Sequence, residues 1–168
     1  MKIKFVILFA LLLICSTGIV YAQFTQARLQ VAGLNCALCS KTTERELRAI
    51  SFISDVKPDL MHNIYVLTFK PGVPVNFDQI GVVVRNENFF ISFLKATVNL
   101  DGVKLSDNTF TNGAETYKLL NPSGKALSGA VELTVVDKGL APRSVSKKYL
   151  GTVIDDPSKT GRVYHLAI

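Results

Sequence analysis

The chain has 168 residues, a formal net charge of +6 at neutral pH and 48% hydrophobic residues. This length accommodates one ordinary domain or two small ones, and the composition is that of a globular protein. The positive charge is spread along the sequence, apart from a loose cluster formed by Lys138, Arg143, Lys147 and Lys148. Nucleic-acid readers concentrate basic residues much more strongly, so we expect no nucleic-acid partner.

The first 22 residues have the pattern of a signal peptide. Lys2 and Lys4 precede an uninterrupted apolar run at residues 5–14, and the small residue Ala22 stands at the expected cleavage position. We predict cleavage before Gln23 and export to the periplasm or the cell envelope. Removal of the two lysines would lower the formal net charge from +6 to +4.

Two other interpretations of this segment are less favoured. An uncleaved membrane anchor would need a longer apolar run, and residues 16–18 interrupt it. A lipoprotein anchored on Cys15 would need a small residue before the cysteine, where the chain has Ile14.

Residues 27–98 predict the order strand, helix, strand, strand, helix, strand. Apolar alternation indicates a strand at residues 28–32, and helical spacing follows at residues 40–50. Pro58 limits the second strand to a sheet edge, and Asn76 is a suitable helix N-cap. The remaining predicted elements are strands at residues 51–56, 64–69 and 90–98 and a helix at residues 77–86. The order is that of the α+β, ferredoxin-like βαββαβ fold.

Residues 100–168 predict a second, small all-β domain after a ferredoxin-like domain at residues 23–99. Glycines separate four short apolar runs, as in an OB-like barrel or a sandwich. The runs lie at residues 116–120, 131–136, 149–154 and 163–168. This part of the sequence has no cysteine and a single histidine, His165, which we expect to have a structural role.

Cys36 and Cys39 are the main candidates for chemistry. With Cys15 in the predicted signal peptide, they are the two cysteines left, three residues apart between a predicted strand and a predicted helix. A disulfide-stapled scaffold uses more cysteines at wider spacing, so this pair indicates a site. Two such thiols can bind one soft metal ion or form a disulfide.

Residues 33–39, Gly-Leu-Asn-Cys-Ala-Leu-Cys, resemble the G-M-x-C-x-x-C signature of heavy-metal-associated domains, a copper-chaperone-like family. Residues 76–80 and 88–90 also resemble the family's second helix start and its aromatic loop. The resemblance covers residues 27–98 and implies metal binding at the two cysteines and transfer to or from a metal-transport or metal-acceptor protein. Leu34 departs from the usual Met, and Thr43 stands where an aliphatic residue is common.

The chemistry of the pair favours Cu(I) over Zn(II). Two thiolates satisfy Cu(I), whereas zinc needs four ligands. Related zinc-selective modules often have an Asp before the first cysteine, where this chain has Asn35. A helix N-terminus beside the cysteines would also favour their thiolate form.

The predicted topology places two more segments at the cysteine end of the sheet. The turn at residues 60–63 would bring Met61 and His62 there, either as auxiliary copper ligands or as a solvated turn on an edge strand. The loop before the last strand would bring Phe89 either over the metal loop or into the core, and the other supports of the metal loop are Gly33, Leu34 and Asn35.

Three further expectations complete the prediction. The third and fourth strands are apolar on both faces, so either the all-β unit or a second copy of the chain should cover the open face of the sheet. The pattern contains no Ser/His/Asp set, phosphate loop or paired-carboxylate cleft, so we expect no enzymatic activity. The alternatives to copper binding are a thiol–disulfide redox protein using the same cysteines, and a binding module without a metal.

Overall fold

The structure is a computed structural model that describes residues 22–103, 105–121, 127–151, 153 and 161–168. Apart from Ala22, the predicted signal peptide lies outside these residues, as does Cys15. Among the described residues, no helix combines the length and apolarity needed to span a membrane.

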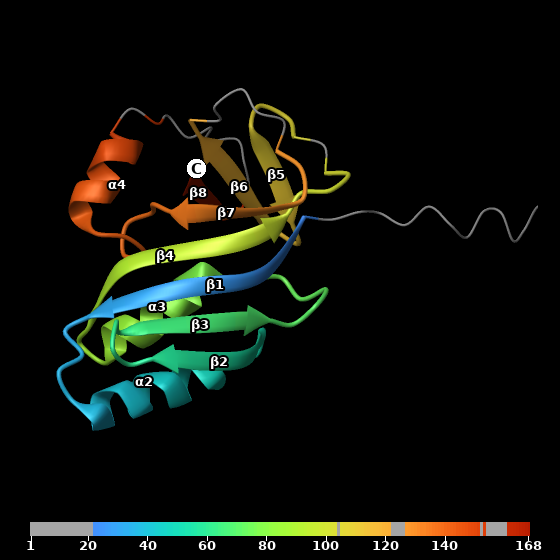
Figure 1. The fold of residues 1–168 in the computed structure, drawn as a ribbon. Helices are drawn as coiled ribbons and strands as arrows, with labels where there is room; N and C mark the ends of the chain where they lie inside the picture. The colour runs from blue at the N-terminus through green and yellow to red at the C-terminus, as the bar shows by residue number, and fades with distance from the viewer. Residues whose placement is uncertain (1–21, 104, 122–126, 152, 154–160) are drawn as a thin grey trace, which may run out of the picture.

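The described residues form an α+β fold with eight strands in one sheet and three helices (Figure 1). The first six elements are β1 (Gln23–Ala32), α2 (Ala37–Arg48), β2 (Ile53–Asp59), β3 (Ile64–Phe69), α3 (Phe77–Asn86) and β4 (Phe90–Asn99). The other five are β5 (Thr109–Asn112), β6 (Glu115–Leu120), β7 (Ala130–Val135), α4 (Arg143–Leu150) and β8 (Val163–Ala167). The strand order in the sheet is β2-β3-β1-β4-β7-β8-β6-β5.

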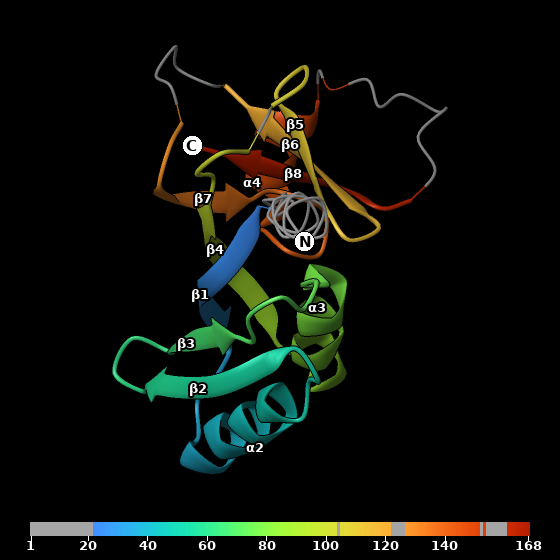
Figure 2. The ribbon, with the colours of Figure 1, turned by 90° about the vertical axis from the view of Figure 1, so that its right-hand side faces the viewer.

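The N-terminal half has the predicted βαββαβ order. β1 pairs antiparallel with both β3 and β4. β2 is an edge strand that pairs only with β3, a position that tolerates Pro58 because proline lacks a backbone N–H donor. α2 and α3 lie on one face of these strands (Figure 2). The predicted cap of α3 is present, because Asn76 Oδ1 accepts a hydrogen bond from Gln79 N at 3.1 Å. α2 begins earlier than the apolar periodicity indicated, with Cys36 as its N-cap.

The C-terminal half differs from the predicted all-β unit. β7 pairs antiparallel with β4, for example Ala96 with Leu133, so β5–β8 extend the N-terminal sheet at its edge. An OB-like barrel or sandwich is therefore not confirmed. The predicted strand at residues 149–154 is wrong where the structure describes it, because Tyr149 and Leu150 belong to α4.

This error has a physical reason. Val145 and Tyr149 are four residues apart, and so are Ser146 and Leu150, which is the helical repeat of one face. Pro142 directly precedes the helix, a position that proline tolerates well. The apolar end of this helix was mistaken for the start of a strand.

β5–β8 continue the sheet beyond β4 instead of forming a separate layer over the face of β1, β3 and β4 opposite α2 and α3. The prediction that they cover this face is therefore not confirmed. Three apolar side chains of this face, Ile64, Val66 and Phe93, are half-buried. Two cations partly cover Phe93: Arg28 Cζ and Lys95 Nζ lie 6.0 and 5.7 Å from its ring centroid. Coverage by a second copy stays a prediction.

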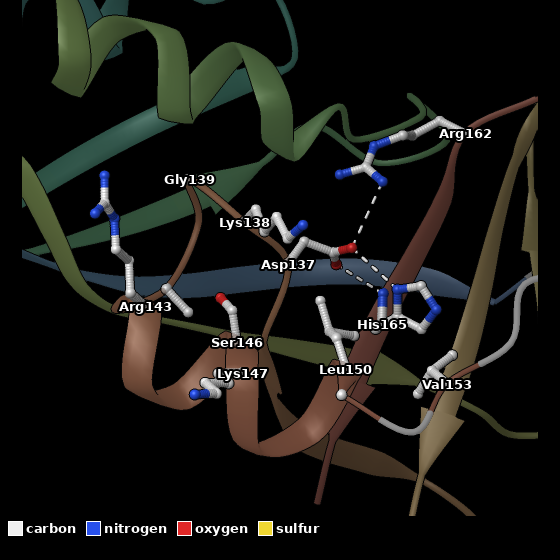
Figure 3. Close-up of a pocket in the computed structure, with 12 residues that line it drawn as sticks. Asp137, Lys138, Gly139, Arg143, Ser146, Lys147, Leu150, Val153, Arg162 and His165 are labelled. Atoms are coloured by element: carbon white, nitrogen blue, oxygen red, sulfur yellow. Dashed lines mark hydrogen bonds and ion pairs between the residues drawn. The ribbon is translucent and has the colours of Figure 1, made fainter.

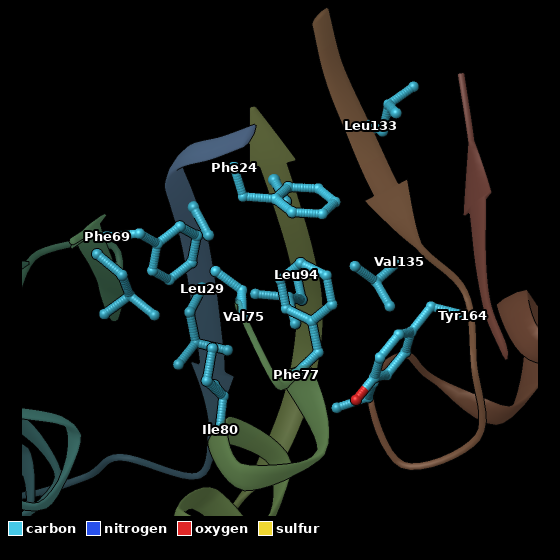
Figure 4. Close-up of a cluster of buried hydrophobic side chains, with 14 of the residues drawn as sticks. Phe24, Leu29, Phe69, Val75, Phe77, Ile80, Leu94, Leu133, Val135 and Tyr164 are labelled. Atoms are coloured by element: carbon cyan, nitrogen blue, oxygen red, sulfur yellow. The ribbon is translucent and has the colours of Figure 1, made fainter. Parts of the chain in front are cut away.

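One aromatic cluster joins the two halves of the chain. Between ring centroids, Phe24 of β1 lies 4.9 Å from Tyr117 of β6. Phe77 of α3 lies 5.4 Å from Tyr164 of β8, and Figure 4 shows these two rings beside Phe24. All four side chains are fully buried. The described residues therefore share one continuous hydrophobic core.

Candidate metal centre

Cys36 and Cys39 lie together at the start of α2. Cys36 is exposed and precedes the helix, Cys39 is half-buried in its first turn, and their Cα atoms are 5.3 Å apart. The two residues form a disulfide in this structure. A thiolate is the form that binds a metal, so this oxidised pair must be reduced before it can act as a metal site.

The loop before the cysteines is held in place by three residues. Gly33 has φ +96°, in the region that favours glycine. A Cβ at this position would lie 3.2 Å from Cδ1 of the Phe89 ring, so the ring packs directly on the glycine. Leu34 is buried in the hydrophobic core, while Asn35 is exposed. Phe89 thus packs on Gly33, while the support that these residues would give to a bound metal stays a prediction.

The start of α2 directs backbone N–H groups towards the first sulfur. Cys39 N donates a hydrogen bond to Cys36 Sγ at 3.0 Å, and Ser40 N donates to Cys36 O at 3.2 Å. The sulfur takes the place of the side-chain oxygen that usually caps a helix. The positive end of the helix dipole would stabilise negative charge on this sulfur once the pair is reduced.

Tyr65 of β3 contacts the start of α2, and its role was not predicted from the sequence. Its hydroxyl donates to Ser40 O at 3.0 Å, linking β3 to the first turn of α2. Burial raises the pKa of this phenol, so it stays a neutral donor. The sequence shows a tyrosine in a predicted strand, but it does not show the hydrogen-bond acceptor, which lies 25 positions earlier in the chain.

The turn between β2 and β3 lies at the cysteine end of the sheet, as its topology predicted. Val31 N, near the end of β1, donates to Asn63 O at 3.0 Å. The His62 ring is engaged by Asp59, with Nδ1 2.8 Å from Oδ2, and Met61 is 91% exposed. Within the described ranges, no group of three or more His, Cys, Asp or Glu residues could hold a metal ion. The two expectations for Met61 and His62, auxiliary ligands or a solvated turn, both stay predictions.

Two exposed apolar side chains accompany the loop. Leu38 lies between the cysteines and is 74% exposed, and Phe90 follows the ring that packs on Gly33 and is also 74% exposed. Large apolar side chains at this exposure are unfavourable in water unless a surface contacts them.

A second polar cluster, at the ends of β7 and β8, was also missed. Asp137 accepts a hydrogen bond from His165 N at 2.7 Å, and its other oxygen lies 3.0 Å from His165 Nδ1 (Figure 3). Arg162 joins this carboxylate, at 3.5 Å, to Asp78 of α3, at 2.8 Å. The His165 and Asp137 side chains are almost fully buried. The cluster ties β8 to the segment after β7 and to α3, which agrees with a structural role for His165.

Ser146 lies near this cluster but does not complete a hydrolase triad. Its Oγ has no hydrogen-bond partner among the described residues. It is therefore not paired with the His165 ring, and a nucleophile needs such a base within hydrogen-bonding distance.

The chain has a match among solved structures but none among family models or curated proteins. No model of a known protein family matches the chain, and no curated protein matches it. Among solved structures, the chain is similar to the yeast copper transporter domain CCC2A, whose solution structure was determined in apo and Cu(I)-loaded states. The identity is 25%, the match covers 39% of this chain and 88% of that one, and the TM-score is 0.35.

Proposed function

We propose that the protein binds Cu(I) through reduced Cys36 and Cys39 and passes it to another protein by thiolate exchange, without catalysing a reaction. The observation that carries this proposal is the placement of both cysteines together at the N-terminus of α2, with Cys36 exposed to solvent. Two thiolates can complete the coordination of Cu(I), whereas a tetrahedral Zn(II) would still lack two ligands.

The surroundings of the loop favour exchange with a partner. Cys36 is exposed, so an incoming thiolate can reach a metal held there. Leu38 and Phe90 offer apolar surface beside it for a metal-transport or metal-acceptor protein. Gly33, Leu34 and Phe89 fix the loop, which limits the rearrangement needed on binding.

The proposal includes export, since residues 1–22 have the pattern of a signal peptide. An oxidising compartment favours the disulfide form. Reduction would consume two electrons and two protons and yield two thiols. Binding of Cu(I) as a bis-thiolate then releases two protons, so metal affinity should increase with pH.

A thiol–disulfide redox protein is the second candidate, and the disulfide between Cys36 and Cys39 favours it. Redox-active cysteines also lie at helix N-termini, where the thiolate is stabilised. In this case the chain would exchange electrons with another dithiol instead of a metal ion.

Anaerobic titration of the reduced protein with Cu(I) against a chromophoric Cu(I) chelator tests the first candidate. The control is the Cys36→Ser/Cys39→Ser variant, because serine is itself a good N-cap and should preserve the start of α2. We expect one tightly bound Cu(I) per chain and an affinity at least about 100-fold lower in the variant. Equal copper uptake by the two proteins would refute copper binding at the pair.

The reduction potential of the pair separates the two candidates. A value between about −270 and −120 mV, the range of disulfide-exchange proteins, would support the redox function if Cu(I) uptake is also absent. Tight Cu(I) binding by the reduced form supports the metal function whatever the potential.

A further inference from the structure

A cavity of about 900 Å³ lies between the segment that follows β7, α4 and β8 (Figure 3). Its size is within the range of small-molecule sites, about 300–1,000 Å³. None of its lining residues belongs to the cysteine loop. It is therefore a separate feature that copper binding leaves unexplained.

The lining of the cavity is strongly positive. It contains the cations Lys138, Arg143, Lys147 and Arg162, and one carboxylate, that of Asp137. This carboxylate is already engaged by Arg162 and by His165. Lys138, Arg143 and Lys147 form no ion pair with any residue in the described part of the chain. Three uncompensated cations around one hollow attract anions.

Ser146 gives an independent indication of a ligand. The residue is only 4% exposed, and its Oγ has no hydrogen-bond partner among the residues that the structure describes. It lines the cavity, with its oxygen pointing away from the α4 backbone (Figure 3). Buried hydroxyl groups in proteins are nearly always paired, so this one lacks an acceptor that a bound molecule could supply.

The N-terminus of α4 contributes to the same site. Arg143 is its first residue, and the N-cap Pro142 has no polar side-chain group that could accept hydrogen bonds from the first backbone N–H groups of the helix. The positive end of the helix dipole therefore adds to the attraction of the cations.

We propose that this cavity binds a small organic anion. Its carboxylate or phosphate group would be held by Arg143 and Lys147 and would accept a hydrogen bond from Ser146 Oγ. The rest of the ligand would pack on the apolar part of the lining, which comprises Ala141, Leu150 and Val153.

Calorimetric titration of the whole protein at fixed ionic strength tests the site with two probes, inorganic phosphate and hexanoate. We expect saturable binding of at least one probe at one site per chain. Binding of phosphate alone would assign a phosphate-bearing ligand, and binding of hexanoate alone would assign a carboxylate with an apolar body. Binding of both supports an anion site that tolerates either group.

Three single variants show whether the probe occupies this cavity. Ser146→Ala and Lys147→Gln should each weaken binding about tenfold, since each removes a hydrogen bond to a charged group. Lys148→Gln is the matched control, because Lys148 neighbours Lys147 on the same helix but does not line the cavity. It should change the affinity by less than about twofold.

Two results would overturn the proposal: no saturable binding of either probe, or equal weakening by Lys147→Gln and Lys148→Gln. Ser146→Ala removes only an unpaired hydroxyl, so its thermal unfolding should match that of the unmodified protein. The Cys36→Ser/Cys39→Ser variant should keep its anion affinity, which separates this site from the copper proposal.

Discussion

Gly33 is the residue on which the geometry of the cysteine loop depends most. Gly33→Ala should destabilise the fold by about 1–2 kcal/mol, because it places a Cβ at positive φ and also against the Phe89 ring. Urea unfolding measures this change. Gly72→Ala is the control: Gly72 also has positive φ, but a Cβ there would meet nothing within 4 Å. Equal losses in the two variants would mean that the Phe89 contact is unimportant.

The contacts of Met61 and His62 predict how strongly these residues contribute to Cu(I) affinity. Met61→Ala/His62→Ala should leave the Cu(I) affinity of the reduced protein within about twofold, because the His62 ring is engaged by Asp59. A chelator competition assay gives this ratio. A loss of tenfold or more would show that the turn supplies a ligand when copper is bound.

Residues that act through sequence neighbours could be predicted, and residues that act through distant partners could not. Cys36 and Cys39 are three positions apart, so their pairing is visible in the sequence alone. Asp137 and His165 are 28 positions apart, and their contact exists only because β8 returns beside the end of β7. The same holds for Arg162 and Asp78, which are separated by 84 positions.

At the scale of elements, α2 is attached to the edge strand β2 through Arg48. Its guanidinium donates to Asp55 Oδ1 and Glu44 Oε1, each at 2.9 Å, and to the carbonyl of Val56. The hydrogen bond from Arg48 lowers the pKa of the Asp55 carboxyl in the folded state. This interaction fastens the C-terminal end of the helix that carries the cysteines.

The Asp55 pKa predicts a pH dependence of stability. A carboxyl whose pKa is lower in the folded state stabilises the fold above its unfolded value, about 3.9, and loses this contribution as the pH falls through the folded value. Asp55→Asn should therefore flatten the fall of the melting temperature between pH 5 and pH 2. Thermal unfolding by circular dichroism across this range is the measurement. Parallel curves for the two proteins would contradict the assigned role of Asp55.

Most elements could be predicted from local pattern, whereas their assembly could not. β3 and α3 have the predicted bounds, because alternation and an N-cap are local signals. β5 was missed because a four-residue strand with one fully buried side chain, Phe110, carries almost no periodicity. The pairing of β7 with β4 is long-range, so glycine-separated strands were equally compatible with a separate barrel.

For the whole molecule, the aromatic cluster implies that both halves unfold together. Phe77→Leu removes ring contacts to Phe24, Tyr117 and Tyr164 and should lower the free energy of unfolding by about 1–2 kcal/mol. We expect one urea transition, with the same midpoint by circular dichroism and by tyrosine fluorescence. Two separated transitions, with only one shifted by the variant, would show that the halves unfold independently.

The continuous sheet also determines which backbone edges remain open to other chains. Pairing with β7 covers the outer edge of residues 95–99 in the ten-residue strand β4. The strands at the two ends of the sheet are β2 and β5. β2 carries Lys57 and Pro58, and β5 has only four residues. Charge, proline and shortness all hinder the addition of a foreign strand. The C-terminal strands therefore replace the β4 end of the sheet by the short edge strand β5, while β2 is an edge in either case.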